Sequence, residues 1–163
     1  MMETAAIGTV ADAVADAVAN TPPLIARLLE RSDTFEISLE TFDEVLKKTS
    51  GLLLLFFTED PVRYRETLDL AVIAPELLAA SEEPMCLGVL LPEAARALQP
   101  RYAFRRWPSF VLLRDGQYLG AIDGMRPWDE YQREMARLQQ AMPSRPPTVG
   151  VTVCSADGDD HCH

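Results

Sequence analysis

Three cysteines, Cys86, Cys154 and Cys162, are the residues of this chain best suited to redox chemistry. Thiol–disulfide exchange needs one reactive thiolate and a second cysteine that resolves the mixed disulfide. No two of the three stand at CxxC spacing, and their odd number argues against a disulfide framework. Cys86 lies in an apolar stretch, so we expect it to be a small buried residue. The pattern favours a reducing compartment and no dithiol enzyme.

The C-terminal tail gathers potential metal ligands: Cys154, Asp157, Asp159, Asp160, His161, Cys162 and His163. Such side chains can bind Zn²⁺ or Ni²⁺. However, the run from His161 to His163 is too tightly spaced for a typical closed tetrahedral site. A small polar segment also supplies no packed shell around an ion. We therefore expect no metal and no other cofactor, and metal delivery by the tail stays open as an alternative.

The charge of the chain excludes some classes of partner. There are 25 Asp and Glu residues against 15 Lys and Arg residues, which gives a net charge of −10. Such a surface repels phosphate backbones, so we expect no nucleic-acid binding. The longest apolar run, residues 52–57, is too short to cross a bilayer, and the first residues lack the cationic region of a signal peptide. The sequence predicts a cytoplasmic protein without membrane insertion.

The length of 163 residues suits one domain with short extensions. Residues 1–20 are rich in alanine, with valines at every fourth position from 10 to 18, and we expect a weakly structured extension. Residues 21–142 carry the pattern of a folded domain. Residues 143–163 are small, polar and acidic, which predicts a disordered tail.

Five strands are predicted, at residues 35–37, 52–57, 85–91, 110–114 and 117–123. The run 52–57 shows no alternation of apolar and polar residues, so its strand should be buried on both faces. Asp115-Gly116 is a strong signal for a two-residue hairpin turn. Strands separated by helices need crossovers and a parallel sheet, whereas the hairpin adds an antiparallel edge. The predicted fold is therefore α/β with a mixed sheet.

Helices are predicted between these strands. We place Thr21 as the N-cap of the first, before a proline, and Ser38 as the cap of the second. Further helices are expected around Pro75, after Pro92 and from Pro127 onward.

This order of elements, with a proline just before the hairpin and a glycine after it, resembles thioredoxin. Trp107-Pro108 stands where thioredoxins keep a cis-proline. Where their WCxxC turn would follow the second strand, Pro61 and Tyr64 occupy the two cysteine positions. The resemblance implies a thioredoxin-like fold: a mixed central sheet flanked by helices, with a cis-Pro before the C-terminal β-hairpin.

A finer resemblance is to the hydrogenase-maturation proteins of the HyaE/HupG type, over roughly residues 23–138. It rests on Asp60-Pro61, Glu76-Leu77-Leu78, Phe104 to Pro108, Asp115-Gly116, Gly120-Ala121, Gly124 and Pro127 to Glu130. This resemblance implies a non-catalytic chaperone that binds the small-subunit precursor of a [NiFe] hydrogenase, which carries a twin-arginine signal peptide, before export. A second maturation chaperone is a further candidate partner.

The candidate partner-binding residues are Glu59, Asp60, Arg105, Arg106, Trp107 and Pro108. Asp60 suits a turn or helix start, and with Glu59 it could also form an acidic lip for a partner's arginines. Trp107 could anchor a bound peptide, although a packing role explains it as well. We assign no catalytic residue. A thiol-dependent oxidoreductase that uses cysteines outside a CxxC motif remains the enzymatic alternative.

Overall fold

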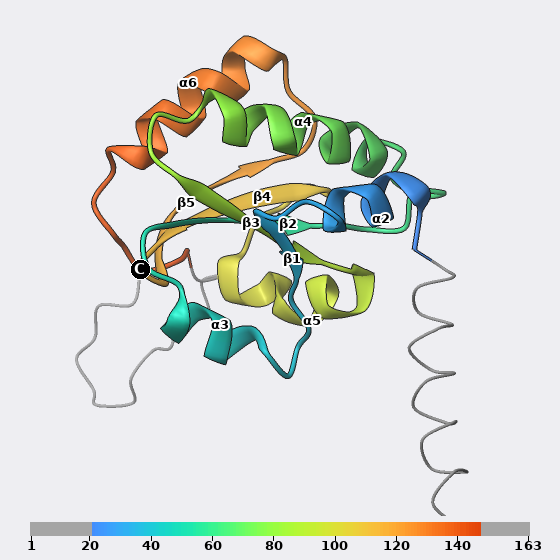
Figure 1. Ribbon diagram of the computed structural model, residues 1–163, viewed down its shortest axis with the longest axis horizontal. Coiled ribbons are helices and arrows are strands. Elements are labelled where there is room, and N and C mark those ends of the chain that lie inside the picture. Colours follow the sequence, from blue (N-terminus) through green and yellow to red (C-terminus); the bar gives the residue numbers. More distant parts are fainter. Residues whose placement is uncertain (1–20, 148–163) are drawn as a thin grey trace, which may run out of the picture.

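The computed structural model describes residues 21–147, which build one five-stranded sheet with helices on both faces (Figure 1). The strands are β1 (Thr34–Glu36), β2 (Leu52–Phe57), β3 (Met85–Leu90), β4 (Ser109–Arg114) and β5 (Gln117–Asp123). Their order across the sheet is β1-β3-β2-β4-β5. β3 pairs in parallel with β1 and β2, and β4 pairs antiparallel with β2 and β5. The predicted mixed sheet is confirmed.

The central strand β2 explains why residues 52–57 are apolar without interruption. Each of its six residues is buried, because β3 and β4 flank it and helices cover both of its faces. The side chains of Leu52, Leu54 and Phe56 face one helix layer, while those of Leu53, Leu55 and Phe57 face the other.

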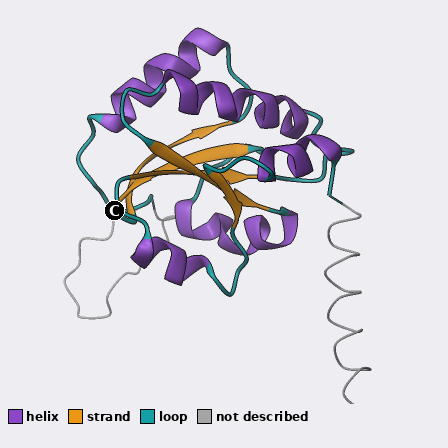
Figure 2. Ribbon diagram, viewed as in Figure 1, coloured by secondary structure: helices purple, strands orange, loops and turns teal. Residues whose placement is uncertain are grey.

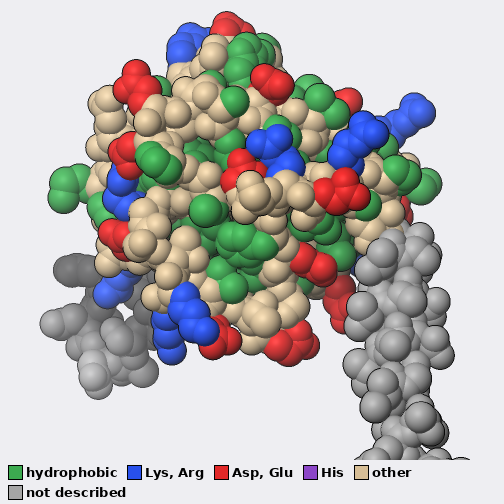
Figure 3. All heavy atoms as spheres, in the orientation of Figure 1, with side chains coloured by type: hydrophobic (Ala, Val, Ile, Leu, Met, Phe, Trp, Pro, Cys, Tyr) green, Lys and Arg blue, Asp and Glu red, His purple; other side chains and the backbone are tan. Residues whose placement is uncertain are grey.

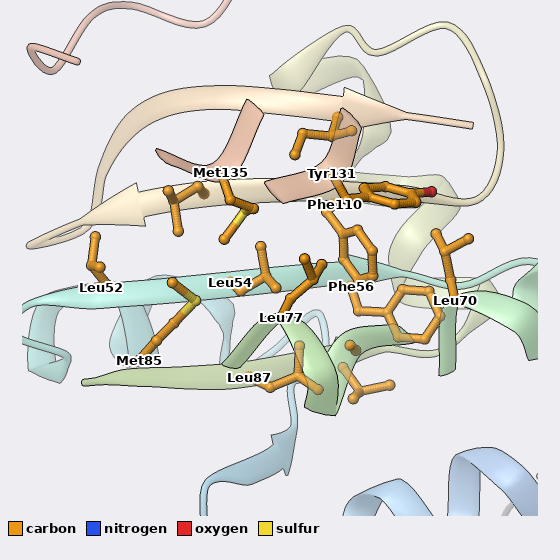
Figure 4. Packing of buried hydrophobic residues seen from close by; sticks show 14 of the residues in the cluster. Leu52, Leu54, Phe56, Leu70, Leu77, Met85, Leu87, Phe110, Tyr131 and Met135 are labelled. Atoms are coloured by element: carbon orange, nitrogen blue, oxygen red, sulfur yellow. The ribbon is translucent and has the colours of Figure 1, made fainter. Parts of the chain in front are cut away.

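The helices are α2 (Pro23–Leu29), α3 (Phe42–Lys48), α4 (Glu66–Ala80), α5 (Pro92–Tyr102) and α6 (Trp128–Gln139). Helices α2, α4 and α6 pack on one face of the sheet, and α3 and α5 pack on the other (Figure 2). On the first face, Tyr131 and Met135 of α6 and Leu70 and Leu77 of α4 converge on the side chains of β2, β3 and β4 (Figure 4). Within residues 21–147, no helix combines the length and the apolar character needed to cross a bilayer.

Two predicted helix starts are wrong by a few residues. Pro22, not Thr21, is the N-cap of α2, because the following Pro23 forces Pro22 into an extended conformation (ψ 142°). Ser38 does not cap α3 directly. Its hydroxyl accepts from the Thr41 N–H while the Thr41 hydroxyl accepts from the Ser38 N–H, and Thr41 is the N-cap.

The hairpin turn forms as predicted. Asp115 (φ 51°) and Gly116 (φ 76°) both take the left-handed conformation that two-residue turns require. Asp115 also joins the turn to the start of β2: its carboxylate accepts from the Gly51 N–H at 2.7 Å, and its own N–H donates to the Gly51 carbonyl at 3.0 Å. These two hydrogen bonds hold the turn between β4 and β5 against the residue that precedes β2.

The first part of the predicted tail, residues 143–147, lies against the sheet. The Ser144 N–H donates to the Tyr118 carbonyl of β5 at 2.9 Å. The predicted N-terminal extension, residues 1–20, and the remainder of the tail, residues 148–163, lie outside the described residues.

Candidate functional site: the Trp107 edge

Four segments meet at one end of the sheet, which we call the Trp107 edge: residues 58–65 after β2, the first turns of α5, residues 103–108 before β4, and residues 124–128 after β5. The strand register brings them together, since Phe57 pairs with Leu90 and with Ser109, and Ser109 pairs with Asp123. The six candidate residues from the sequence belong to two of these segments. The structure thus places them at one edge.

The segment after β2 forms a turn without cysteine. Asp60 organises it, because its carboxylate accepts from the Val62 N–H and its carbonyl accepts from the N–H groups of Arg63 and Tyr64. The turn role predicted for Asp60 is thus confirmed. The helix expected around Pro75 is α4, which begins at Glu66 and contains Pro75. Thiol exchange at this turn has no nucleophile.

Glu59 is buried, with 7% of its side chain exposed. Arg96 of α5 contacts both of its carboxylate oxygens, with Nε to Oε2 at 2.8 Å, and the Asp60 N–H donates to Oε1 at 2.8 Å. Burial raises the pKa of the Glu59 carboxyl, but the hydrogen bonds from Arg96 and the Asp60 N–H lower it by more, so the net pKa lies below the ordinary value. Glu59 therefore presents no unpaired carboxylate to a partner.

The Trp107-Pro108 peptide bond is cis, as the resemblance to thioredoxin implied. Its loop is fixed on both sides: the Gly124 N–H donates to the Pro108 carbonyl at 2.9 Å, and the Gln99 side chain donates to the Phe104 carbonyl at 2.6 Å. The Trp107 ring packs edge-on against Phe104, with centroids 5.0 Å apart, and stays partly exposed. Trp107 thus has both the packing role and the accessible surface considered for it.

Arg105 and Arg106 precede Trp107 and are both exposed. The Arg105 N–H donates to the Asp123 carboxylate at 3.1 Å, which leaves its guanidinium outside that contact. Arg106 passes over Gly124, where any Cβ would lie 3.1 Å from its Cδ. The backbone of this stretch is held against the end of β5, while both guanidinium groups face solvent.

Charge at this edge is locally basic, although the chain is acidic. Four arginines here are exposed and make no ion pair with any described residue: Arg63, Arg65, Arg105 and Arg106. On the face shown in Figure 3, acidic and basic side chains are intermingled with hydrophobic surface between them. The expected acidic lip is therefore reduced to Asp60, which is partly exposed and already bonded within its turn.

The roles of two residues at this edge were not predicted from the sequence. Arg96 lies 37 positions from Glu59, and nothing in the local sequence links them. Tyr131 of α6 fixes the loop after β5: its hydroxyl donates to the Gly124 carbonyl at 2.8 Å and accepts from the Arg126 N–H. Long-range hydrogen bonding of this kind leaves no pattern in the sequence.

The expectation for Cys86 is wrong, because its side chain is exposed. It points to the face covered by α3 and α5, yet it lies beyond the pairing with β1, which begins at Leu87. The helices on that face leave this end of β3 uncovered. Cys86 lies at the start of β3, opposite the Trp107 edge, so its thiol does not replace the missing cysteines.

Among residues 21–147, no group of His, Cys, Asp and Glu side chains is placed to hold a metal ion. The tail ligands considered above, from Cys154 to His163, lie outside the described residues.

The strand order, the cis-proline and the cysteine-free turn define a class: a thioredoxin-like protein that lacks the thioredoxin dithiol. The fold is similar to that of a mutant thioredoxin from Halobacterium salinarum, with a TM-score of 0.53 and 17% identity over 68% of this chain and 94% of that one. The model of the family "Hydrogenase-1 expression protein HyaE" matches residues 24–131. The chain belongs to that family of hydrogenase expression and formation proteins.

Individual relatives agree with this assignment. The hydrogenase expression/formation protein HoxO of Cupriavidus necator is 40% identical, over 87% of this chain and 89% of the relative. The hydrogenase expression/formation protein HupG of Rhodobacter capsulatus is 34% identical, over 68% of this chain and 80% of the relative.

Proposed function

We propose that this protein is a non-catalytic chaperone of [NiFe] hydrogenase maturation. It binds the small-subunit precursor, including its twin-arginine signal peptide, in the cytoplasm before export. Membership of the hydrogenase expression and formation family supports the process. The absence of cysteine from the turn after β2 supports binding in place of thiol chemistry.

The observation that carries the proposal is the state of Trp107. Its ring is held on Phe104 and partly exposed, and its backbone N–H and carbonyl make no backbone hydrogen bond with the described residues. An unpaired donor and acceptor beside an anchored aromatic ring can add an extended peptide strand. A rigid aromatic side chain is also the usual centre of a binding hot spot.

The contacts that we propose are those of the candidate residues. Trp107 and Pro108 take the extended segment, Arg105 and Arg106 flank it, and Asp60 borders it on the side of β2. Glu59 takes part through Arg96, whose guanidinium it orients. A second maturation chaperone would bind the precursor at sites that do not contact this edge.

Titration of the purified protein with the precursor, with and without its signal peptide, tests the proposal. We expect binding to the full precursor and weaker binding once the signal peptide is removed. Equal affinity for both forms would rule out the signal peptide as a determinant. No binding to either form would remove the chaperone function altogether.

Two variants localise the contact. Trp107→Ala should mainly speed dissociation of the precursor, because the anchoring ring is lost. Trp107→Phe keeps a ring for packing on Phe104 and should restore part of the residence time. If both variants dissociate like the wild type, the precursor binds elsewhere on the molecule.

A further inference from the structure

We propose that the Trp107 edge selects a segment in which acidic residues alternate with apolar ones, with arginines contacting the carboxylates and Trp107 contacting an apolar side chain. The four arginines are Arg63, Arg65, Arg105 and Arg106. The inference rests on the proposed function in one respect only, that this edge binds a polypeptide.

Unpaired arginines concentrate here. Among the described residues, the arginines that do form ion pairs are Arg31, Arg96, Arg101, Arg114, Arg126, Arg133 and Arg137. Arg63 and Arg65 stand in the turn after β2, and Arg105 and Arg106 stand before β4, its neighbour in the sheet. The planar guanidinium matches a carboxylate with two parallel hydrogen bonds, so exposed arginines that lack an ion-pair partner suit an acidic ligand.

Several acidic groups of the same edge are already engaged, whereas Glu66 and Glu93 are exposed and make no ion pair with a described residue. Arg96 pairs with Glu59, and Arg126 pairs with Asp123 at 3.2 Å. The Asp60 carboxylate accepts from the Val62 N–H at 3.0 Å. The four exposed arginines therefore outnumber the carboxylates of this edge that lack an arginine partner, which are Asp60, Glu66 and Glu93. An incoming carboxylate would therefore gain attraction without displacing an internal pair.

Exposed apolar side chains belong to the same edge as these charges. Val62 is 87% exposed beside Arg63, and Met125 (48%) and Trp128 (39%) follow the end of β5. Together with the accessible part of Trp107, they offer apolar contact area at the Trp107 edge. Side chains of an extended peptide point alternately to opposite sides, so alternating acidic and apolar residues would present one kind to the arginines and the other to these apolar groups.

The exposed arginines of this edge limit which part of the precursor can bind there. The basic start of a twin-arginine signal peptide would meet like charge here, and like-charge contacts oppose association. The edge would therefore take an acidic and apolar stretch of the precursor and leave the basic start of the signal peptide outside it. The net charge of −10 would still attract the basic region from a distance.

The test uses the full chain and two short synthetic peptides, measured by isothermal titration calorimetry. In one peptide glutamate alternates with leucine and phenylalanine, and in the other lysine replaces each glutamate. We expect the acidic peptide to bind and the basic one to bind at least about tenfold more weakly at about 50 mM salt, where screening is weak.

Double substitutions then test which positive charges contribute to binding of the acidic peptide. Arg105→Gln/Arg106→Gln should weaken binding of the acidic peptide about three- to tenfold. The control is Lys47→Gln/Arg145→Gln, which removes the same charge from exposed residues that make no ion pair among those described. Both lie at the other end of the sheet: Arg145 lines a hollow with Gly116, and Gly116 lies against Leu46, the neighbour of Lys47. The control should leave the affinity unchanged.

Several outcomes would overturn the inference: no binding of the acidic peptide, tighter binding of the basic one, equal loss in both double variants, or preference for a single-stranded oligonucleotide. Circular dichroism of each variant checks that the fold is kept. Repeating the precursor titration with both variants separates the two proposals. If the precursor binds the Arg105/Arg106 variant as well as the wild type, the charge inference fails while the chaperone function stands.

Discussion

At the scale of single residues, the Glu59–Arg96 pair is buried on one side only: the carboxylate is enclosed, whereas the arginine side chain is 53% exposed. Enclosure makes the carboxylate dependent on its donors, because a buried polar group without partners is costly. The exposed guanidinium still meets solvent, which screens its charge. This pair fixes the first turns of α5 to the turn after β2.

Replacing Glu59 tests that dependence. Glu59→Ala should lower the free energy of unfolding at pH 7 by about 1–3 kcal/mol, because Arg96 and the Asp60 N–H lose their acceptor. Since the folded pKa lies below the unfolded value of about 4.3, the stabilisation by Glu59 is present above that value and is lost as the pH falls through the folded pKa. Urea unfolding at pH 7 and at pH 3 should show the gap between variant and wild type shrinking at the lower pH.

The exposed thiol of Cys86 gives a second prediction. In a Cys154→Ser/Cys162→Ser background, Cys86 should react fully with iodoacetamide under native conditions, and Cys86→Ser should leave the melting temperature unchanged. An insulin-reduction assay should give the same background rate for the wild type and for a chain with all three cysteines replaced. Cysteine-dependent turnover in that assay would revive the oxidoreductase alternative.

At the scale of elements, the turn between β4 and β5 fits closely against the chain that precedes β2. A Cβ on Gly116 would lie 2.7 Å from the Leu46 carbonyl oxygen, in addition to the strain of its positive φ. Gly51 has a similar φ of 78°, yet no atom lies within 4 Å of the Cβ position. A side chain at Gly51 would therefore meet backbone strain alone, whereas one at Gly116 would meet both backbone strain and a steric clash.

Alanine at these glycines should therefore have unequal effects. Gly51→Ala should cost about 1–2 kcal/mol, the penalty of an L-residue in the left-handed region. Gly116→Ala should cost about 1–3 kcal/mol more than that, because the end of α3 must move. Urea midpoints of the two variants provide the comparison, and equal losses would show that the turn is looser than the structure indicates.

The hydroxyl of Tyr131 connects α6 to the loop after β5. Tyr131→Phe should destabilise the fold by about 1–2 kcal/mol, because the buried Gly124 carbonyl loses its donor. Tyr118→Phe is the matched control, since the Tyr118 hydroxyl makes no hydrogen bond with the described residues and should be nearly neutral. Thermal unfolding followed by circular dichroism distinguishes them. A neutral Tyr131→Phe would contradict the anchoring role.

At the scale of the whole molecule, the negative net charge and the basic Trp107 edge act over different distances. Long-range attraction follows the net charge, whereas contacts within a few ångströms follow the local groups. The association rate of the full precursor should therefore fall as salt rises from about 50 mM to about 300 mM, while the dissociation rate changes less. Stopped-flow measurement of both rates checks this, and a salt-independent association rate would contradict electrostatic steering.

Much of this architecture was predictable from sequence, because it follows from local patterns. The unbroken apolar run of residues 52–57 predicts the central strand, and Asp115-Gly116 predicts the turn. The resemblance to thioredoxin predicted the cis bond before Pro108 and the replacement of the two turn cysteines by Pro61 and Tyr64. The exposure of Cys86 and the Glu59–Arg96 pair depend on how long β1 is and where α5 lies. Such tertiary facts are not encoded within a few neighbouring residues.

The position of the two tryptophans has a practical consequence. Trp107 belongs to the Trp107 edge, and Trp128 begins α6 four residues after Gly124, which is bonded to Pro108. The chain contains no other tryptophan. All of its indole emission therefore originates beside the proposed binding surface. A ligand without tryptophan that docks there should shift or quench the intrinsic fluorescence directly, so the protein carries its own optical reporter and needs no attached dye.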